Sequence, residues 1–158
     1  MIMTENVVPE SRTYRHFACK TETTISGQPF SVMSNPLSDM ARTWCSQCGA
    51  HFPLSEYEWS DTNEKVTDYY ARHSAKATPL QVFLCSRRCM ILLAATGFLL
   101  GAIGGYFLFR NNALWLQILM PIACGGFGAF GGLAVYISAL CGPITQKVCG
   151  VSDTRTLT

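Results

Sequence analysis

Charged residues are scarce in this 158-residue chain. Asp, Glu, Lys and Arg together make up 14% of the sequence, whereas soluble domains carry about 25%. Residues 1–90 hold nine basic and nine acidic side chains, so this part of the chain is close to neutral. Proteins that bind nucleic acid need clustered basic side chains, and we therefore expect no nucleic-acid partner.

The sequence also lacks the motifs of common enzyme classes. It contains no phosphate-binding loop, no dinucleotide-binding fingerprint, and no Ser-His-Asp or paired-carboxylate arrangement. The opening stretch MIMTENVVPESRTYRH has polar and acidic residues where a secretory signal has its apolar core. We therefore expect a non-enzymatic protein whose first apolar segment serves as an internal signal-anchor.

Two long segments carry no charge at all, over residues 90–109 and 112–146. About 20 apolar residues in a helix cross the roughly 30 Å hydrocarbon core of a bilayer. The sequence therefore predicts an α-helical membrane protein with a two-span transmembrane hairpin over residues 90–141, its spans covering about 90–109 and 117–140. The alternative is a buried hairpin in a soluble protein, but the rest of the chain is too polar to cover two such helices.

The basic residues that flank these segments indicate an orientation. Arg87, Arg88 and Lys147 lie outside the two spans, whereas the loop between the spans carries only Arg110. Because Lys and Arg favour the cytoplasmic side, we expect an integral, multi-pass membrane protein with both termini in the cytoplasm. Neither span contains an Asp, Glu, His, Lys or Arg residue, so the sequence does not indicate an ion or proton path.

The chain before the spans predicts a small lobe preceded by an arm. Residues 1–42 mix polar residues with Pro and Gly without a sustained period, which predicts a mostly irregular arm with a short strand near QPFSVM. Residues 43–89 predict a small N-terminal α+β zinc-binding lobe with an inserted helix over 62–77. One face of that helix would carry Val66, Tyr69, Tyr70 and His73. Residues 142–158 predict a flexible tail.

Four cysteines in this lobe have the spacing of a metal site. Cys45 and Cys48 form a C-x2-C pair followed by Gly49, and Cys85 and Cys89 form a C-x3-C pair. Two such pairs supply the four thiolates of a tetrahedral Zn²⁺ site. Glycine after the second cysteine permits the left-handed backbone that such a turn favours. The sequence therefore predicts one structural Zn²⁺ per chain.

The stretch LCSRRC resembles the second half of treble-clef zinc fingers of the FCS/TRASH type, which reads F-C-S-x-x-C, with Leu84 here in the Phe position. The resemblance covers only residues 45–89, and the 36 residues between the two cysteine pairs make a longer gap than that type has. It implies metal ligation by the four cysteines and no activity.

Other readings of the cysteines and histidines stay open. WCSQC also looks like the WCxxC of thioredoxin-type proteins, so the four cysteines could instead serve a redox or metal-transfer site. His51 could replace one cysteine as a ligand, and Cys19 lies alone in the arm. Cys141 and Cys149 flank a Gly-Pro pair and could form a disulfide or carry a lipid.

Small residues recur every four positions in both spans. The first span contains Gly97, Gly101 and Gly105, and the second contains Gly128 and Gly132. Such rows let two helix backbones approach closely in lipid, so we expect these five glycines to pack the two spans together. Further glycines lie off these rows, which indicates contact with another helix, either from a protein partner or through self-association.

These observations lead to two functional hypotheses. The first is a zinc-stabilised, non-enzymatic membrane protein that serves as a scaffold, an adaptor or an accessory subunit of a larger membrane assembly. The alternative is a thiol-based metal-handling or redox membrane protein that uses the four cysteines.

Overall fold

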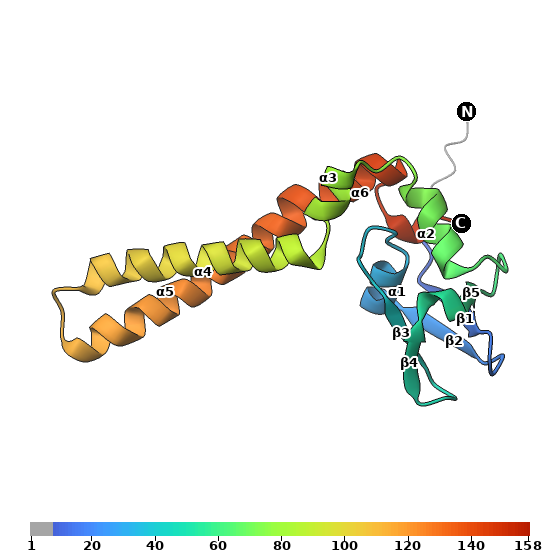
Figure 1. Ribbon diagram of the computed structural model, residues 1–158, viewed down its shortest axis with the longest axis horizontal. Coiled ribbons are helices and arrows are strands. Elements are labelled where there is room, and N and C mark those ends of the chain that lie inside the picture. Colours follow the sequence, from blue (N-terminus) through green and yellow to red (C-terminus); the bar gives the residue numbers. More distant parts are fainter. Residues whose placement is uncertain (1–7) are drawn as a thin grey trace. The chain divides into compact units, whose positions relative to one another are not determined.

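The computed structural model describes residues 8–158, which divide into two compact units (Figure 1). The first, here called the sheet lobe, comprises the described residues up to Thr78 together with Thr145–Thr158. The second, here called the helical unit, comprises Pro79–Ile144. The sheet lobe thus contains one segment that precedes the two long helices in the sequence and one that follows them.

Two small antiparallel sheets form the framework of the sheet lobe. Three strands pair in the order β2-β1-β5, with β1 at Ser11–His16, β2 at Glu22–Ser26 and β5 at Tyr57–Trp59. The second sheet is a hairpin of β3 (Arg42–Cys45) and β4 (Ala50–Pro53). A strand alternates its side chains between two faces, and in β1 the buried face carries Arg12, Tyr14 and His16.

Two short helices and a 3-10 turn pack with these sheets. They are α1 (Gly27–Met33), α2 (Val66–Ser74) and the turn Leu54–Glu56. The hydrophobic core of the lobe comprises Tyr14, Met33, Cys45, Leu54, Tyr57, Trp59, Val66, Tyr69 and Leu157. Aromatic rings form much of this core, so a small lobe buries a large apolar area with few side chains.

The N-terminal arm is folded, contrary to the sequence prediction of a mostly irregular segment over 1–42. Its residues from Ser11 onward form β1, β2 and α1, and the predicted strand near QPFSVM is the helix α1. The prediction failed because two of the three side chains on the buried face of β1 are Arg and His, so β1 shows no hydrophobic alternation. Residues 1–7 lie outside the described part of the chain.

The C-terminal segment is also folded, although the sequence predicted a flexible tail over 142–158. Gly142–Cys149 form the helix α6, and Thr154–Thr156 form a 3-10 turn. Leu157 then enters the core of the sheet lobe, with 7% of its surface exposed. A single apolar residue in a polar stretch gives no periodic signal, which is why the sequence did not reveal this contact. The helix predicted over 62–77 appears as α2, with Val66 and Tyr69 buried.

The helical unit consists of a short helix α3 (Pro79–Leu84) and two long helices, α4 (Arg87–Phe109) and α5 (Leu114–Val135). Ser86 caps α4 by accepting a hydrogen bond from the backbone N–H of Cys89. After α5 the chain continues through a π-helical segment, Tyr136–Cys141. By length and composition, two helices of the described chain are apolar enough to cross a membrane.

Helices α4 and α5 run side by side, and glycines allow their backbones to touch (Figure 1). A Cβ added at Gly97 would overlap the carbonyl oxygen of Gly128, and one added at Gly132 would overlap that of Leu93. Gly101 meets the backbone of Cys124 in the same way, and Gly105 meets the side chain of Cys124. All five glycines expected to pack the helices therefore lie at their contact.

The outward faces of the two helices are apolar and uncovered. Many of their large side chains are more than half exposed, among them Leu100, Leu108, Phe127 and Phe130. Gly104, Gly126 and Gly131 have no neighbour within 4 Å of an added Cβ among residues 8–158. Soluble monomers rarely expose so large a contiguous apolar surface.

Candidate metal centre

Two strands of the sheet lobe end in turns that carry metal-binding side chains. His16 is the last residue of β1, and Cys19 follows it by three positions. Cys45 is the last residue of β3, and Cys48 again follows by three positions. We call residues 16–20 the first ligand turn and residues 45–49 the second ligand turn.

The two ligand turns share one backbone geometry. In the first, the N–H of Lys20 donates to the carbonyl of His16 at 2.9 Å, and in the second, the N–H of Gly49 donates to the carbonyl of Cys45 at 3.0 Å. The last residue of each turn is left-handed, with φ of 59° at Lys20 and 63° at Gly49. Each turn therefore aims two side chains at the same side, as a tetrahedral metal site requires.

The four donor atoms of these turns converge on one point. They all lie within 4.8 Å of one another. The Nδ1 atom of His16 is 3.3 Å from Sγ of Cys19 and 3.6 Å from Sγ of Cys48, and the two sulfurs of Cys19 and Cys45 are 3.5 Å apart. Around a tetrahedral Zn²⁺ with ordinary bond lengths, neighbouring sulfurs lie about 3.8 Å apart, and sulfur and nitrogen about 3.6 Å. The spacing thus suits a zinc ion bound by one imidazole and three thiolates.

The sulfur distances do not describe disulfides. A disulfide needs its sulfurs about 2.05 Å apart, which is far shorter than the 3.5 Å between Cys19 and Cys45. All eight cysteines of the chain lie within the described residues, and none of them forms a disulfide. The sulfurs are therefore available as metal ligands.

His16 is held in position by three side chains. Its ring stacks on Tyr57 with 4.8 Å between centroids and lies 4.6 Å from the ring of Phe52. Its second nitrogen, Nε2, is 3.3 Å from Oε2 of Glu56. Metal-binding histidines commonly donate their other N–H to a carboxylate, which fixes the tautomer and the ring orientation. With Nε2 donating to Glu56, the lone pair of Nδ1 is left for the ion.

The site lies at the surface of the sheet lobe. His16 and Cys45 are each 1% exposed, whereas Cys19 is half-buried and Cys48 is exposed. Two ligands are thus anchored in the core and two face outward. A bound ion would be reached from solvent by way of Cys48.

The groups of the site influence one another's pKa values. Hydrogen bonds from Thr21 lower the pKa of Cys19 to about 6, which favours its thiolate at neutral pH. Its hydrogen bond with Cys45 is the main cause that raises the pKa of Cys48 to about 12. Burial lowers the pKa of His16, but its hydrogen bonds with Cys19 and Glu56 outweigh burial and leave this pKa raised. Adjacent thiolates repel one another, and a divalent cation removes that repulsion.

The structure groups only half of the expected zinc ligands. Cys45 and Cys48 belong to the group, and its other two members are His16 and Cys19 rather than Cys85 and Cys89. The latter two cysteines belong to the helical unit, at the start of α4. There Cys85 donates from Sγ to the carbonyl of Cys141 at 3.9 Å, and its own carbonyl accepts from the hydroxyl of Tyr136 at 2.6 Å. Zinc ligation by Cys85 and Cys89 stays a prediction.

The sequence held a signal for the two members of this group that were not predicted. His16 and Cys19 form H-x2-C, which has the spacing of the C-x2-C pair at Cys45 and Cys48. His51, considered as a substitute ligand, instead packs its ring against Trp44 with 5.2 Å between centroids. The pair of His16 and Cys19 was not recognised because it lies at the end of β1, a strand that was not predicted.

Comparison with known proteins gives no relative for this chain: no family model, no curated protein and no solved structure matches it.

Proposed function

We propose that this chain is a non-enzymatic, two-span membrane protein whose sheet lobe is stabilised by one Zn²⁺ bound by His16, Cys19, Cys45 and Cys48. Its role is that of a scaffold, adaptor or accessory subunit in a membrane assembly. The convergence of four donor atoms at tetrahedral spacing carries this proposal.

A structural role for the ion follows from the number and placement of its ligands. Four protein donors fill a tetrahedral shell, whereas catalytic zinc sites keep one position for water or substrate. The first ligand turn follows β1 of the three-stranded sheet, and the second follows β3 of the hairpin. One ion would therefore join the two sheets of a lobe with a small core.

Two observations support membrane insertion. The two long helices have the length and composition of membrane spans, and their outward faces are apolar and exposed. The segment before the two long helices and the segment after them both belong to the sheet lobe. A chain that crosses the membrane twice would bring these two segments to the same side of it. The positions of Arg87, Arg88 and Lys147 favour the cytoplasm for that side.

The scaffold role rests on the uncovered surface of the two helices. Gly97, Gly101 and Gly128 are used within the pair, whereas Gly104, Gly126 and Gly131 face open space among the described residues. Close helix approach at glycines is a main source of association in lipid. Cross-linking in native membranes should trap the chain with another helix. A chain that is recovered only as a monomer would contradict this part of the proposal.

Metal analysis of the purified full-length chain tests the zinc site. We expect one zinc per chain in mild detergent and an absorption spectrum of the cobalt-substituted protein that is typical of tetrahedral coordination by three sulfurs and one nitrogen. Cys19→Ser and His16→Ala should abolish stoichiometric zinc, whereas Cys85→Ser and Cys89→Ser should retain it. Loss of zinc in the Cys85 and Cys89 variants, with retention in the His16 and Cys19 variants, would replace the site with the four-cysteine set.

A second candidate, metal transfer or redox chemistry, is favoured by one observation. Cys48 is exposed, and hydrogen bonds from Thr21 lower the pKa of the neighbouring Cys19 to about 6. An exposed cysteine beside an ionised thiolate suits ligand exchange. Zinc that survives mild chelation would support the structural role. Labile copper, or a thiol pair that cycles reversibly between oxidised and reduced forms, would support the second candidate.

A further inference from the structure

Residues 153–158, here called the closing segment, complete the fold of the sheet lobe from the far end of the chain. They lie beyond α6, and Leu157 joins the core built by the N-terminal half. The segment is ordered by its own contacts as well. Asp153 accepts a hydrogen bond from the backbone N–H of Arg155 at 2.9 Å and forms an ion pair with its guanidinium.

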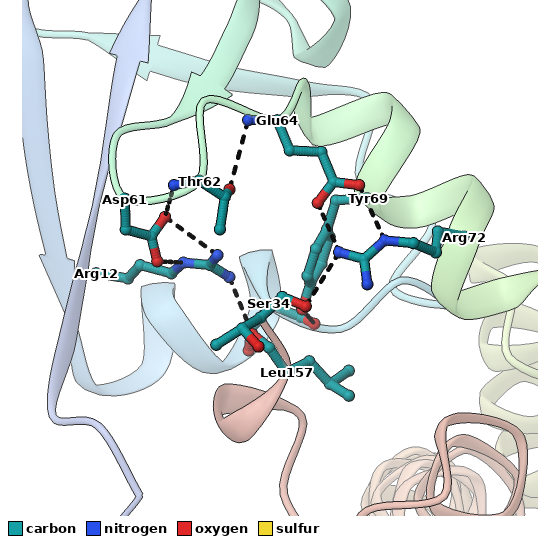
Figure 2. A network of polar contacts seen from close by, with 9 residues as sticks. Arg12, Ser34, Asp61, Thr62, Glu64, Tyr69, Arg72 and Leu157 are labelled. Carbon is teal, nitrogen blue, oxygen red and sulfur yellow. Dashed lines mark hydrogen bonds and ion pairs between the residues drawn. The ribbon is translucent and has the colours of Figure 1, made fainter.

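A buried arginine of β1 holds the backbone of the closing segment (Figure 2). Arg12 is 8% exposed, and its guanidinium lies 4.1 Å from the centre of the Trp59 ring. Its Nε and Nη2 atoms donate to the two carboxylate oxygens of Asp61 at 3.0 and 3.2 Å. Its Nη1 atom donates to the carbonyl of Leu157 at 3.1 Å. Without Leu157, the Nη1 donor of this buried guanidinium would lose its partner, which is costly.

Two more elements contact the closing segment. Arg72 of α2 donates to the carbonyl of Thr158 at 3.0 Å while it pairs with Glu64. At the end of α1, the hydroxyl of Ser34 lies 3.3 Å from that of Thr154. Figure 2 shows the pair of Arg72 with Glu64 in the same network as Ser34, Tyr69 and Leu157. One short segment thus joins β1, α1 and α2.

The same contacts reach the metal ligands. Leu157 shares its core cluster with the ligand Cys45 and with Tyr57, whose ring stacks on His16. Arg12 and His16 lie on the buried face of one strand, four residues apart. Tyr14 lies between them in the strand, and its hydroxyl donates to the carbonyl of Trp44, the residue before Cys45, at 2.8 Å. Loss of the closing segment would loosen the supports of both ligand turns.

We infer that the closing segment is a strap that controls how firmly the sheet lobe holds its metal. The lobe is complete only after the chain has been made through the second long helix and residues 153–158 have packed on β1, α1 and α2. Metal retention is thereby coupled to completion of the helical hairpin. This inference rests on the proposed zinc site.

The test compares full-length variants that gain the same charge at two positions. Leu157→Asp places a carboxylate in the core, and Ser152→Asp places one at an exposed position just before the closing segment. The readout is the rate at which zinc passes to a colorimetric chelator. We expect Leu157→Asp to release zinc roughly ten-fold faster or more, because a buried unpaired carboxylate destabilises the lobe. Ser152→Asp should match the wild type, and an unchanged rate in Leu157→Asp overturns the inference.

A rescue in trans separates the strap from general misfolding. A chain that stops after residue 152 should release zinc quickly, and a synthetic peptide of residues 149–158 should slow the release in a concentration-dependent way. The same peptide with Leu157→Asp should not. Failure of the native peptide to slow release, at concentrations up to its solubility, would count against the strap.

Failure of the proposed function gives a different result. A wild-type chain that holds no zinc refutes the metal site. Amide hydrogen exchange of β1 and β3 in the same variants then shows whether the closing segment still closes the lobe.

Discussion

The sulfur atoms of Cys19 and Cys45 lie 3.5 Å apart, although Cys19 follows β1 of one sheet and Cys45 ends β3 of the other. Within residues 8–158, no strand of the three-stranded sheet pairs with a strand of the β3–β4 hairpin. The two sheets are instead joined by the shared core and by hydrogen bonds from the hydroxyls of Tyr14 and Tyr57 to carbonyls of β3. A bound ion would thus contribute to the folding free energy of the whole lobe.

Removal of the metal should therefore lower the thermal stability of the sheet lobe. With a strong chelator we expect the melting temperature to fall by roughly 10 °C or more, since 1 kcal/mol shifts a domain of this size by about 4–8 °C. Circular dichroism in detergent would follow the transition. Zn²⁺ added back should restore the melting temperature, whereas Mg²⁺ should not. A melting temperature that does not respond to the chelator would contradict a structural ion.

Glu56 should set the affinity of the site without touching the ion. Its carboxylate lies 3.3 Å from Nε2 of His16, and loss of such a partner typically weakens metal binding about 10- to 100-fold. We expect Glu56→Ala to raise the dissociation constant for zinc within that range, and Glu56→Gln, which retains an acceptor oxygen, to raise it less. Competition with a chelator of known affinity measures both.

Glu58→Ala provides the matched control for Glu56. This carboxylate lies two residues further along the chain and pairs with Arg15 rather than with His16. Its loss should leave the dissociation constant close to the wild-type value. Equal effects of the two substitutions would mean that Glu56 acts only through general charge and not by orienting the imidazole.

The local part of the architecture could be predicted from the sequence. The two long helices were recognisable because every residue of each segment contributes to the signal. The spacing of Gly97, Gly101 and Gly105 placed them on one helix face, and that face meets α5. Gly49 has the left-handed backbone that was expected after the C-x2-C pair.

The non-local part of the site could not be predicted. Which residues complete the group with Cys45 and Cys48 depends on how β1 and β3 come together, and β1 carries Arg12 and His16 on its buried face. Polar side chains on a buried face are stabilised by partners far along the chain, such as Asp61 for Arg12, which lies 49 residues away. Spacing alone therefore favoured the second cysteine pair over H-x2-C.

His73 should make the stability of the sheet lobe depend on pH. Burial and the nearby charge of Arg72 lower the pKa of this imidazole. Its Nε2 atom is buried without a hydrogen-bond partner in the described chain, and its ring lies 4.6 Å from that of Tyr69. The unfolded chain therefore binds a proton more readily than the folded lobe, so stability should fall as the pH drops below about 6.5.

A comparison of variants isolates this contribution from protonation of the metal ligands. The ligands titrate in both the wild type and His73→Phe, so their effect cancels in the difference between the two proteins. Denaturant unfolding at pH 7.5 and pH 5.5 should show a larger loss of unfolding free energy in the wild type. An equal loss in the two proteins would mean that folding leaves the pKa of His73 at its unfolded value.

The glycines of α4 should differ sharply in their tolerance of alanine. At Gly97, an added Cβ would overlap the carbonyl of Gly128, so Gly97→Ala must push the two helices apart. At Gly104, an added Cβ meets nothing within 4 Å among residues 8–158, so Gly104→Ala keeps the packing and gains about 1 kcal/mol of helix propensity. Both substitutions add the same methyl group to the same helix, which removes hydrophobicity as an explanation.

Unfolding of the hairpin in detergent, followed by energy transfer between dyes on α4 and α5, should show destabilisation by Gly97→Ala only. Equal behaviour of the two variants would mean that α4 and α5 are not in backbone contact.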